Sequence, residues 1–457
     1  MVWYYLLLFS TLVSMTTYAS SPTSNAVGSL GLGTASYFGS LSDDRNPVFS
    51  SLHAKWFGVE QGRLFEVAAQ AELNLTINKM SYYSVEFAQV YAGTSRRLSS
   101  VQLLSGRKLV SWNQLDERWK LGVWQPCFRW DYLNPETVGL IGAFLTINQP
   151  IFQAVLFGSP IFIPERGAPI EFKDGRVRSD SPWFLQPNST VNVFGQNTKI
   201  SYSLAATPVQ EIIAHPGAGA MARIGEKEGP WTSAAYAYKP MNQLLMGYDG
   251  YLSIPSDSII ATIYPRVAYH HVGSVEAGFS AKPVSAWLSV FGERPERDMT
   301  PASWTTQEVS QALAVGSAID FEVYKRGRYV TVIDMSYLRQ WGGDAPDTGP
   351  LASDGMSSFE SRYRFKHALT VGLRTPFHGL LGRWSRDLSA NSRVTYDTKS
   401  LSQMVSTELK YRAQESWTVG VGADLLTSGP AESSSDPDFI SKYRSNDRIH
   451  GGVTYAF

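Results

Sequence analysis

The chain ends in Asp447-Arg-Ile-His-Gly-Gly-Val-Thr-Tyr-Ala-Phe457, a stretch in which the side chains alternate in character. Successive side chains of a strand point to opposite sides, so the apolar residues at every second position from Ile449 to Phe457 share one face. The other face carries Arg448, His450 and small residues. In a soluble protein such a terminal strand exposes unpaired backbone groups, whereas a closed membrane barrel needs it to complete its wall.

Val453, Tyr455 and Phe457 resemble the C-terminal signature of bacterial outer-membrane β-barrels. In that family the barrel-assembly machinery recognises a terminal Phe and alternating apolar residues upstream of it. The resemblance implies a location in the bacterial outer membrane, contact with its lipid, and the assembly machinery as a partner during insertion. It covers only the last strand, and a soluble β-sandwich with this ending is the alternative.

Residues 1–19 have the pattern of a secretory signal peptide, with an apolar run from Val2 to Met15 and small residues before the expected cleavage point at Ala19. The run is shorter than the roughly 20 apolar residues that a spanning helix needs. We therefore expect residues 20–457 to be exported and to form one domain.

The composition excludes several classes of function. Lys and Arg number 40, as do Asp and Glu, and this balance argues against a nucleic-acid partner, which would select a basic excess. Cys127 is the only cysteine, so no intramolecular disulfide and no cysteine-rich metal site can form. We expect no cofactor and no metal, and a structural role for the thiol.

Alternation recurs along the chain. In residues 63–77 seven apolar residues at alternate positions share a face, and this run exceeds the usual soluble strand of about 5–6 residues. It fits the roughly 9–11 residues that cross a membrane as a tilted strand. Further runs lie at 80–91, 99–111, 118–124, 138–147, 151–158, 189–204, 218–225, 231–239, 244–254, 259–271, 274–281, 284–292, 312–325, 328–339, 359–374, 391–397, 401–412 and 416–426. The pattern predicts an all-β fold, a transmembrane antiparallel up-and-down β-barrel of about 16–20 strands, and we set the number at 18.

Connector lengths predict an asymmetric barrel. Counting back from the last strand, the long connectors face outside and the short turns face the periplasm, apart from the long inner connector 375–390. The outside connectors are 427–440, 340–358 and 293–310, and the inside turns are 413–416, 325–328, 282–283 and 255–257. The longest irregular stretch, 158–188, is rich in proline and charge, and we expect an external lid or a loop that narrows the lumen, with disorder as the alternative.

The face opposite the apolar one is expected to line the lumen, and its charges are the candidate site. Early strands contribute the acidic residues Glu66, Glu72 and Glu86. Late strands contribute the basic residues Arg326, Arg328, Arg362, Arg364, Lys366, Arg393, Lys410 and Arg412. Gly420 and Gly422 leave room on the same face.

Opposed charge clusters of this kind resemble those of general porins. The resemblance implies passive passage of small polar or charged solutes through a wet, charged lumen. One alternative is a static charge network that fills the interior. The other is a non-conducting barrel that serves as a scaffold, as the anchor of an envelope complex, or as a surface receptor through its long loops.

A second resemblance lies in the middle of the chain. Residues 105–112, Ser-Gly-Arg-Lys-Leu-Val-Ser-Trp, and residues 131–135, Asp-Tyr-Leu-Asn-Pro, are similar to a strand start and turn of the alginate-export-type family of outer-membrane barrels. That family also implies transport across the outer membrane. Relatives commonly carry glycine after the Trp, where this chain has Asn113.

No pattern predicts catalysis. The adjacent His270 and His271 face opposite sides of a strand and cannot act together, and no metalloprotease or nucleophile-elbow motif occurs. Residues 291–297, which hold two Glu and two Arg, are better explained by a network of ion pairs at the rim of the barrel. We expect a protein that is not an enzyme.

Overall fold

The computed structural model describes the chain apart from residues 1–23, 39–46, 79–82, 185–186, 188, 194, 227, 254–257, 297–300, 302, 327–328, 350–361, 378–386 and 431–437. The predicted signal peptide, residues 1–19, lies outside the described residues. None of the described helices is long and apolar enough to cross a membrane.

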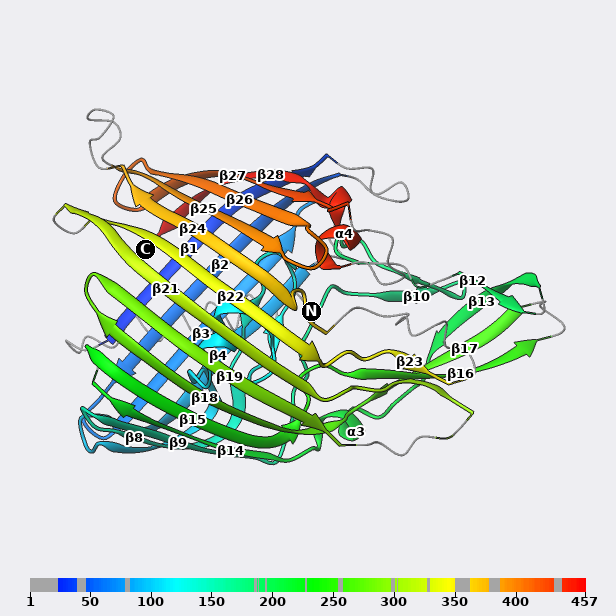
Figure 1. Cartoon of the computed structure of the whole chain (residues 1–457), viewed down its shortest axis with the longest axis horizontal. Coiled ribbons are helices and arrows are strands. Elements are labelled where there is room, and N and C mark those ends of the chain that lie inside the picture. The colour runs from blue at the N-terminus through cyan, green and yellow to red at the C-terminus, as the bar shows by residue number, and fades with distance from the viewer. Residues whose placement is uncertain are drawn as a thin grey trace.

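Eighteen antiparallel strands pair with their neighbours in chain order and close into a barrel (Figure 1). They are β1 (Ser24–Tyr37), β2 (Val48–Gln61), β3 (Phe65–Thr76), β4 (Tyr83–Thr94), β5 (Val101–Lys108), β8 (Leu140–Asn148), β9 (Phe152–Ser159), β14 (Gly217–Gly225), β15 (Gly229–Pro240), β18 (Tyr269–Ala281), β19 (Val284–Pro295), β21 (Ala312–Arg326), β22 (Tyr329–Gly342), β24 (His367–Pro376), β25 (Leu388–Asp397), β26 (Gln403–Arg412), β27 (Trp417–Thr427) and β28 (Arg448–Ala456). The predicted fold class and strand number are confirmed.

The first and last strands close the barrel. β1 pairs with β28 from Ser29 opposite Ala456 to Tyr37 opposite Arg448. Beyond that ladder, the backbone groups of Gly28 and Phe457 exchange two hydrogen bonds of 2.9 Å. The terminal residue is therefore part of the wall.

The membership of the barrel differs from the prediction. Residues 24–37 and 48–61 are barrel strands that the predicted runs do not include. On the inner face of the first, Tyr37 is the one large side chain, and the others, from Ser29 to Ala35, are too small to mark a strand face. Four predicted runs, 118–124, 189–204, 244–254 and most of 259–271, lie outside the wall. The twenty predicted strands less these four, with the two missed strands added, give the observed eighteen.

The two ends of the barrel differ. One end, here the turn end, carries the short connectors and the C-terminus, on the left in Figure 1. The other, the loop end, carries a six-stranded sheet that projects beyond the barrel (Figure 1). Its strands are β12 (Thr190–Val193), β13 (Gln196–Leu204), β17 (Ser258–Arg266), β16 (Leu245–Ser253), β20 (Thr305–Gln307) and β23 (Asp347–Thr348). The loop end also holds the hairpin β10 (Glu171–Lys173) and β11 (Arg176–Arg178) and the short helices α3 (Val209–Ile213), α4 (Phe439–Lys442) and η3 (Arg444–Asn446).

The predicted asymmetry of the connectors is confirmed where they are described. The connectors that join β19 to β21, β22 to β24 and β27 to β28 are long and lie at the loop end. The connector between β24 and β25 is the long exception at the turn end, as predicted. Residues 255–257, predicted as an inner turn, lie outside the described residues.

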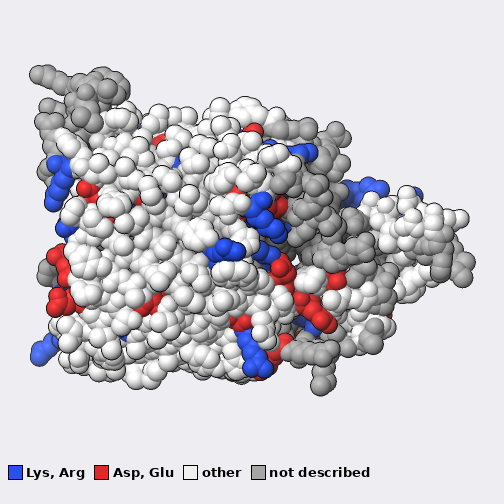
Figure 2. Space-filling model, in the orientation of Figure 1, with Lys and Arg blue, Asp and Glu red and all other residues white. Residues whose placement is uncertain are grey.

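The outward face of the wall is apolar and the inward face is polar. On β3, Phe65 is 68% exposed while Glu66 is 4% exposed. On β28, Val453 and Tyr455 point outward, and the inward Arg448 is buried. Figure 2 shows a wall nearly free of charge in its middle, with the charged residues gathered towards the two ends. An apolar band of this kind belongs to a barrel that spans a membrane.

Gly106 on β5 occupies a position that only glycine fits. Its φ is +126°, and a Cβ there would lie 2.3 Å from the carbonyl oxygen of Val90. The close approach lets β5 pair with β4 just before the chain leaves the wall.

We predict that Gly106→Ala lowers the stability of the folded barrel by about 1–3 kcal/mol, because it combines a disfavoured φ with a backbone clash. The measurement is the temperature at which half of the protein has unfolded. It is read from the loss of the fast-migrating folded band when samples are incubated at increasing temperatures before electrophoresis. Gly158→Ala on β9 is the control, since no atom lies within 4 Å of the added Cβ. Equal midpoints for the two variants would refute the role of Gly106.

Candidate functional site

The connector between β5 and β8 folds into the lumen. This segment, residues 109–139, is called the inner loop, and it contains α2 (Gln114–Trp119), β6 (Cys127–Phe128) and β7 (Glu136–Thr137). The side chain of Asn113 caps α2 by accepting a 2.8 Å hydrogen bond from the amide of Asp116. The helix ends at Lys120, which adopts the left-handed conformation. It contacts β19 and β21 on the inside of the wall.

A carboxylate of the wall holds the start of α2. Glu276 on β18 accepts a 2.8 Å hydrogen bond from Asn113 and a 2.7 Å bond from the amide of Gln114. At the other end of the helix, Arg118 forms ion pairs with Asp334 and, at 3.5 Å, with Asp320. The helix is therefore fixed against one side of the wall by charge-assisted hydrogen bonds at both ends.

The inner loop has a small core of its own. Trp112 stacks on Trp124 with ring centroids 5.6 Å apart. The buried carboxylate of Asp116 accepts hydrogen bonds from the amides of Val123 (2.9 Å) and Trp124 (3.3 Å), and burial raises its pKa to about 6. Burial likewise raises the pKa of the Cys127 thiol to about 12, which leaves it a protonated, structural group.

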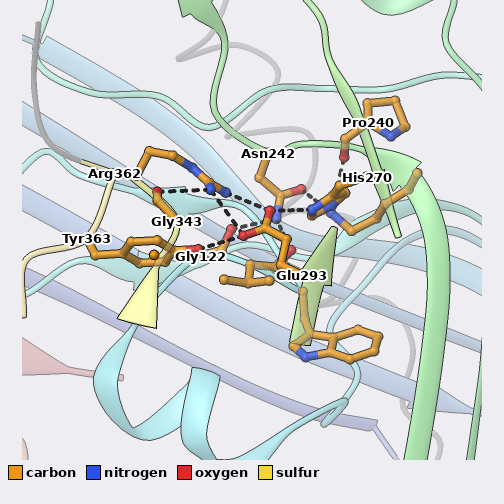
Figure 3. Close-up of polar contacts among 12 residues, drawn as sticks. Gly122, Pro240, Asn242, His270, Glu293, Gly343, Arg362 and Tyr363 are labelled. Atoms are coloured by element: carbon orange, nitrogen blue, oxygen red, sulfur yellow. Dashed lines mark hydrogen bonds and ion pairs between the residues drawn. The ribbon is translucent and has the colours of Figure 1, made fainter. Parts of the chain in front are cut away.

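A second set of contacts centres on Glu293 of β19 (Figure 3). Arg362 donates two hydrogen bonds to this carboxylate, at 2.8 and 3.1 Å, and the hydroxyl of Tyr363 donates a third at 2.8 Å. His270 of β18 lies 2.5 Å from the same carboxylate, while His271 is exposed on the opposite face, as the alternation predicted. Of residues 291–297, predicted to form an ion-pair network at the rim, Glu293 belongs to this buried network, and its partners Arg362 and His270 come from outside that stretch.

The basic residues Arg362, Arg364 and Lys366 are not in a strand, contrary to the run predicted at 359–374. β24 begins only at His367. Before it, Arg362 and Arg364 bond through their side chains to Glu293 and to the inner loop. Lys366 forms an ion pair with Asp344. The three basic residues are thus part of a connector that folds into the mouth.

Arg364 ties this connector to the inner loop. Its guanidinium donates to the carbonyl oxygens of Trp119 (3.2 Å), Tyr132 (2.8 Å) and Leu133 (3.1 Å). Burial lowers the pKa of Arg364 to about 10, so the group stays charged at neutral pH. Asn242, which follows β15, adds bonds of 2.8 and 3.0 Å to the carbonyls of residues 122 and 123 (Figure 3).

Two of the predicted acidic residues are buried in static pairs. Glu66 accepts hydrogen bonds from Gln61 (3.1 Å) and Tyr91 (3.2 Å). Glu86 pairs with Arg107 at 2.5 Å and with Arg166 at 3.3 Å. In this part of the lumen the contacts therefore match the alternative stated above, a static charge network that fills the interior.

The other predicted residues are spread along the wall. Glu72, Arg393 and Lys410 line an open cavity. Arg412 is exposed at the turn end of β26. Arg326 is the last residue of β21, and the side chains of Arg326 and Arg328 lie outside the described part of the structure.

The open space of the lumen lies between the inner loop and one side of the wall. Two adjoining cavities of about 480 and 580 Å³ share their lining, and together they form the space called the slot. The shared residues are His53, Lys55, Trp130, Asp131, Asn134 and His450. The wall residues of the slot come mainly from β1–β3 and β25–β28.

The wall of the slot is thinned by glycine. Gly31 and Gly33 of β1 and Gly452 of β28 line it with bare backbone. The prediction that Gly420 leaves room is supported by the 3.8 Å between a Cβ there and its nearest neighbour. A Cβ on Gly422 would lie 2.6 Å from the ring of His450, which fills that space instead.

Aromatic side chains cover the slot at the loop end. Trp183 packs on Tyr443 and Tyr132, with ring centroids 5.4 and 6.4 Å apart. The hydroxyl of Tyr443 donates to the carbonyl of Trp183 at 2.8 Å, and Asn446 donates to that of Pro182 at 2.8 Å. The end of the predicted loop 158–188 thus reaches into the mouth, while the inner loop narrows the lumen below it.

No protein-family model matches the chain, and no curated protein matches it. Among solved structures, OccK2 (OpdF) of Pseudomonas aeruginosa gives a TM-score of 0.49 at 10% identity, over 95% of this chain and 97% of that one. The OccK2 complex with glucuronate gives 0.48 at 10% identity, over 95% and 96%. OccAB3 of Acinetobacter baumannii gives 0.48 at 10% identity, over 95% and 99%. Likenesses at this level assign neither a family nor a solute to this chain.

We predict that Arg364→Ala loosens the inner loop, because three buried carbonyl groups lose a charged donor, at a cost of about 3 kcal/mol. The measurement is the rate at which a protease cuts within residues 109–139 of the barrel in detergent. Lys366→Ala is the matched control, since its half-exposed ion pair contributes at most about 1 kcal/mol. Equal cleavage rates for both variants would contradict the assignment.

Proposed function

We propose that the protein is a channel of the bacterial outer membrane through which small polar solutes pass passively. The observation that carries the proposal is the slot, two adjoining cavities with charged and polar residues in their lining, between the inner loop and the thinned wall of the barrel. The barrel is oriented with its turn end towards the periplasm and its loop end towards the outside of the cell. The lipid of that membrane surrounds the apolar band, and the barrel-assembly machinery inserts the chain.

The charges of the slot support a channel of weak ion preference rather than a basic one. Among the residues that line either cavity, four are basic and five are acidic, so the formal sum is 4 − 5 = −1 with His neutral. The basic residues are Lys55, Arg393, Lys410 and Arg448, and the acidic residues are Glu72, Asp131, Glu136, Glu408 and Asp424. The basic wall expected from residues 362–366 does not contribute, because those side chains are bound in the mouth.

We predict that Gly33→Leu lowers the single-channel conductance in planar bilayers to about half or less, because a branched side chain enters the slot. Gly158→Leu is the matched control. Gly158 pairs with Ala143 and Ala218, both exposed, and so faces outward. A folded wild-type barrel that never conducts would refute the channel, and equal conductance for both variants would refute the slot as its path.

Ion preference gives a second test of the path. We predict that Lys410→Glu raises the cation-to-anion permeability ratio about twofold or more, because a cation on the slot becomes an anion. The reversal potential in a salt gradient measures this ratio. Arg339→Glu is the control, since Arg339 lies on the outer face over Trp341. A shift of the same size in both variants would mean that Lys410 does not act locally.

The projecting sheet supports a second role, recognition of an envelope or surface partner. Its strands and the nearby helix α3 leave large apolar side chains exposed, among them Tyr251 (59%), Leu252 (51%), Leu204 (52%) and Val209 (64%). A channel does not need such a surface. Replacement of Tyr251 and Leu252 by Ser, followed by cross-linking in intact cells, tests this role: loss of a specific adduct with unchanged conductance supports it.

A further inference from the structure

Trp130 lies where the two cavities of the slot meet. Its ring helps to line both cavities, and it stacks on Phe128 with centroids 6.3 Å apart and planes at 29°. The same space is bounded by the bare backbone of Gly31 and Gly452. A cavity lined by an aromatic ring, itself stacked on a neighbouring ring, and by backbone without side chains suits a flat solute with an apolar face.

The cations of the slot are already engaged by carboxylates. Lys55 Nζ lies 2.8 Å from Glu72 and 2.6 Å from Glu136. The others pair as Arg448 with Asp131 and Asp424 (both 2.7 Å), Lys410 with Glu408 (2.9 Å), and Arg393 with Asp334 (3.8 Å). An anionic solute would have to displace a carboxylate from one of these pairs, in a lining where acids outnumber bases. The slot therefore disfavours anions.

Hydrogen-bonding groups without charge line the same two cavities. Asn134, which also bonds to Asp131, lines both, and Ser29 and Ser406 line one each. Ser51, Asn74 and Thr407 line them as well and bond to neighbouring side chains. A paired carboxylate keeps free lone pairs, so the acidic residues can still accept bonds from neutral hydroxyls. Donors, acceptors and an aromatic ring together are what a sugar ring needs, because its hydroxyls point outward and its C–H face is apolar.

We propose that the slot contains a binding site for an uncharged pyranose sugar, which stacks on Trp130 and bonds through its hydroxyls to the groups around the ring. This inference rests on the proposed function, because a sugar site in the lumen has a role only if solutes pass through it. It narrows that function from polar solutes in general to neutral saccharides in preference to anionic ones.

Two measurements test the site, one of them independent of conduction. The first is calorimetric titration of the barrel in detergent with maltotriose, a neutral oligosaccharide used as probe, and with glucuronate as the anionic comparison. The second is the block of ion current in planar bilayers by maltotriose. We expect saturable maltotriose binding, weaker glucuronate binding, and a matching block of the current.

Trp130→Ala is expected to weaken maltotriose binding about tenfold, which corresponds to about 1.4 kcal/mol. Trp417→Ala is the matched control, because its indole lies on the outer face against Tyr455 and should leave binding unchanged. Trp130→Phe, which keeps a ring, should retain most of the affinity and guards against a folding defect. The folded state of each variant is checked by the migration of unheated samples on gels.

Three results would overturn the sugar site: no calorimetric binding of maltotriose, glucuronate binding as tight as that of maltotriose, or unchanged binding in a folded Trp130→Ala barrel. A wild-type barrel that binds maltotriose but carries no current would overturn the channel instead. The two failures are therefore distinguishable.

Discussion

A strand within a membrane must satisfy its backbone hydrogen bonds inside the protein, since hydrocarbon offers no partners. The pairing of β1 with β28 meets this demand for the two strands that would otherwise be edges. The exchange between Gly28 and Phe457 extends it to the last residue. With the wall closed, every inward side chain faces one confined space. Connectors that fold into this space, such as the inner loop, supply the partners for the inward side chains.

The wall was predictable from sequence and the interior was not. Alternation identified the lipid face of β28 and β3, because apolar contact with the membrane acts on each residue separately. The same rule failed for β1, whose inner face is mostly small residues, and for residues 362–366, where alternating basic residues look like a strand. These residues lie outside the strand, and their side chains bind a buried carboxylate and buried carbonyl groups instead.

The inner loop shows why contacts of this kind stay hidden in a sequence. Helix α2 has only six residues, too few to be stable alone, and it exists because Asn113 and Arg118 find Glu276 and Asp334 on strands far away in the chain. The core of the inner loop is equally non-local in origin, since Trp112 and Trp124, twelve positions apart, are buried against each other. A local cue was present in the Asn cap, but nothing local indicates where the helix docks.

The glycines of the slot lie on β1 and β28, which are the first and last strands of the barrel and meet at its seam. Bare backbone on both sides of the seam means that the passage has no lining of its own there. At these glycines the slot is bounded by the two strands whose hydrogen bonds close the barrel. Closure of the wall and formation of the slot are thus one event, because the slot has no wall on this side until β28 pairs with β1.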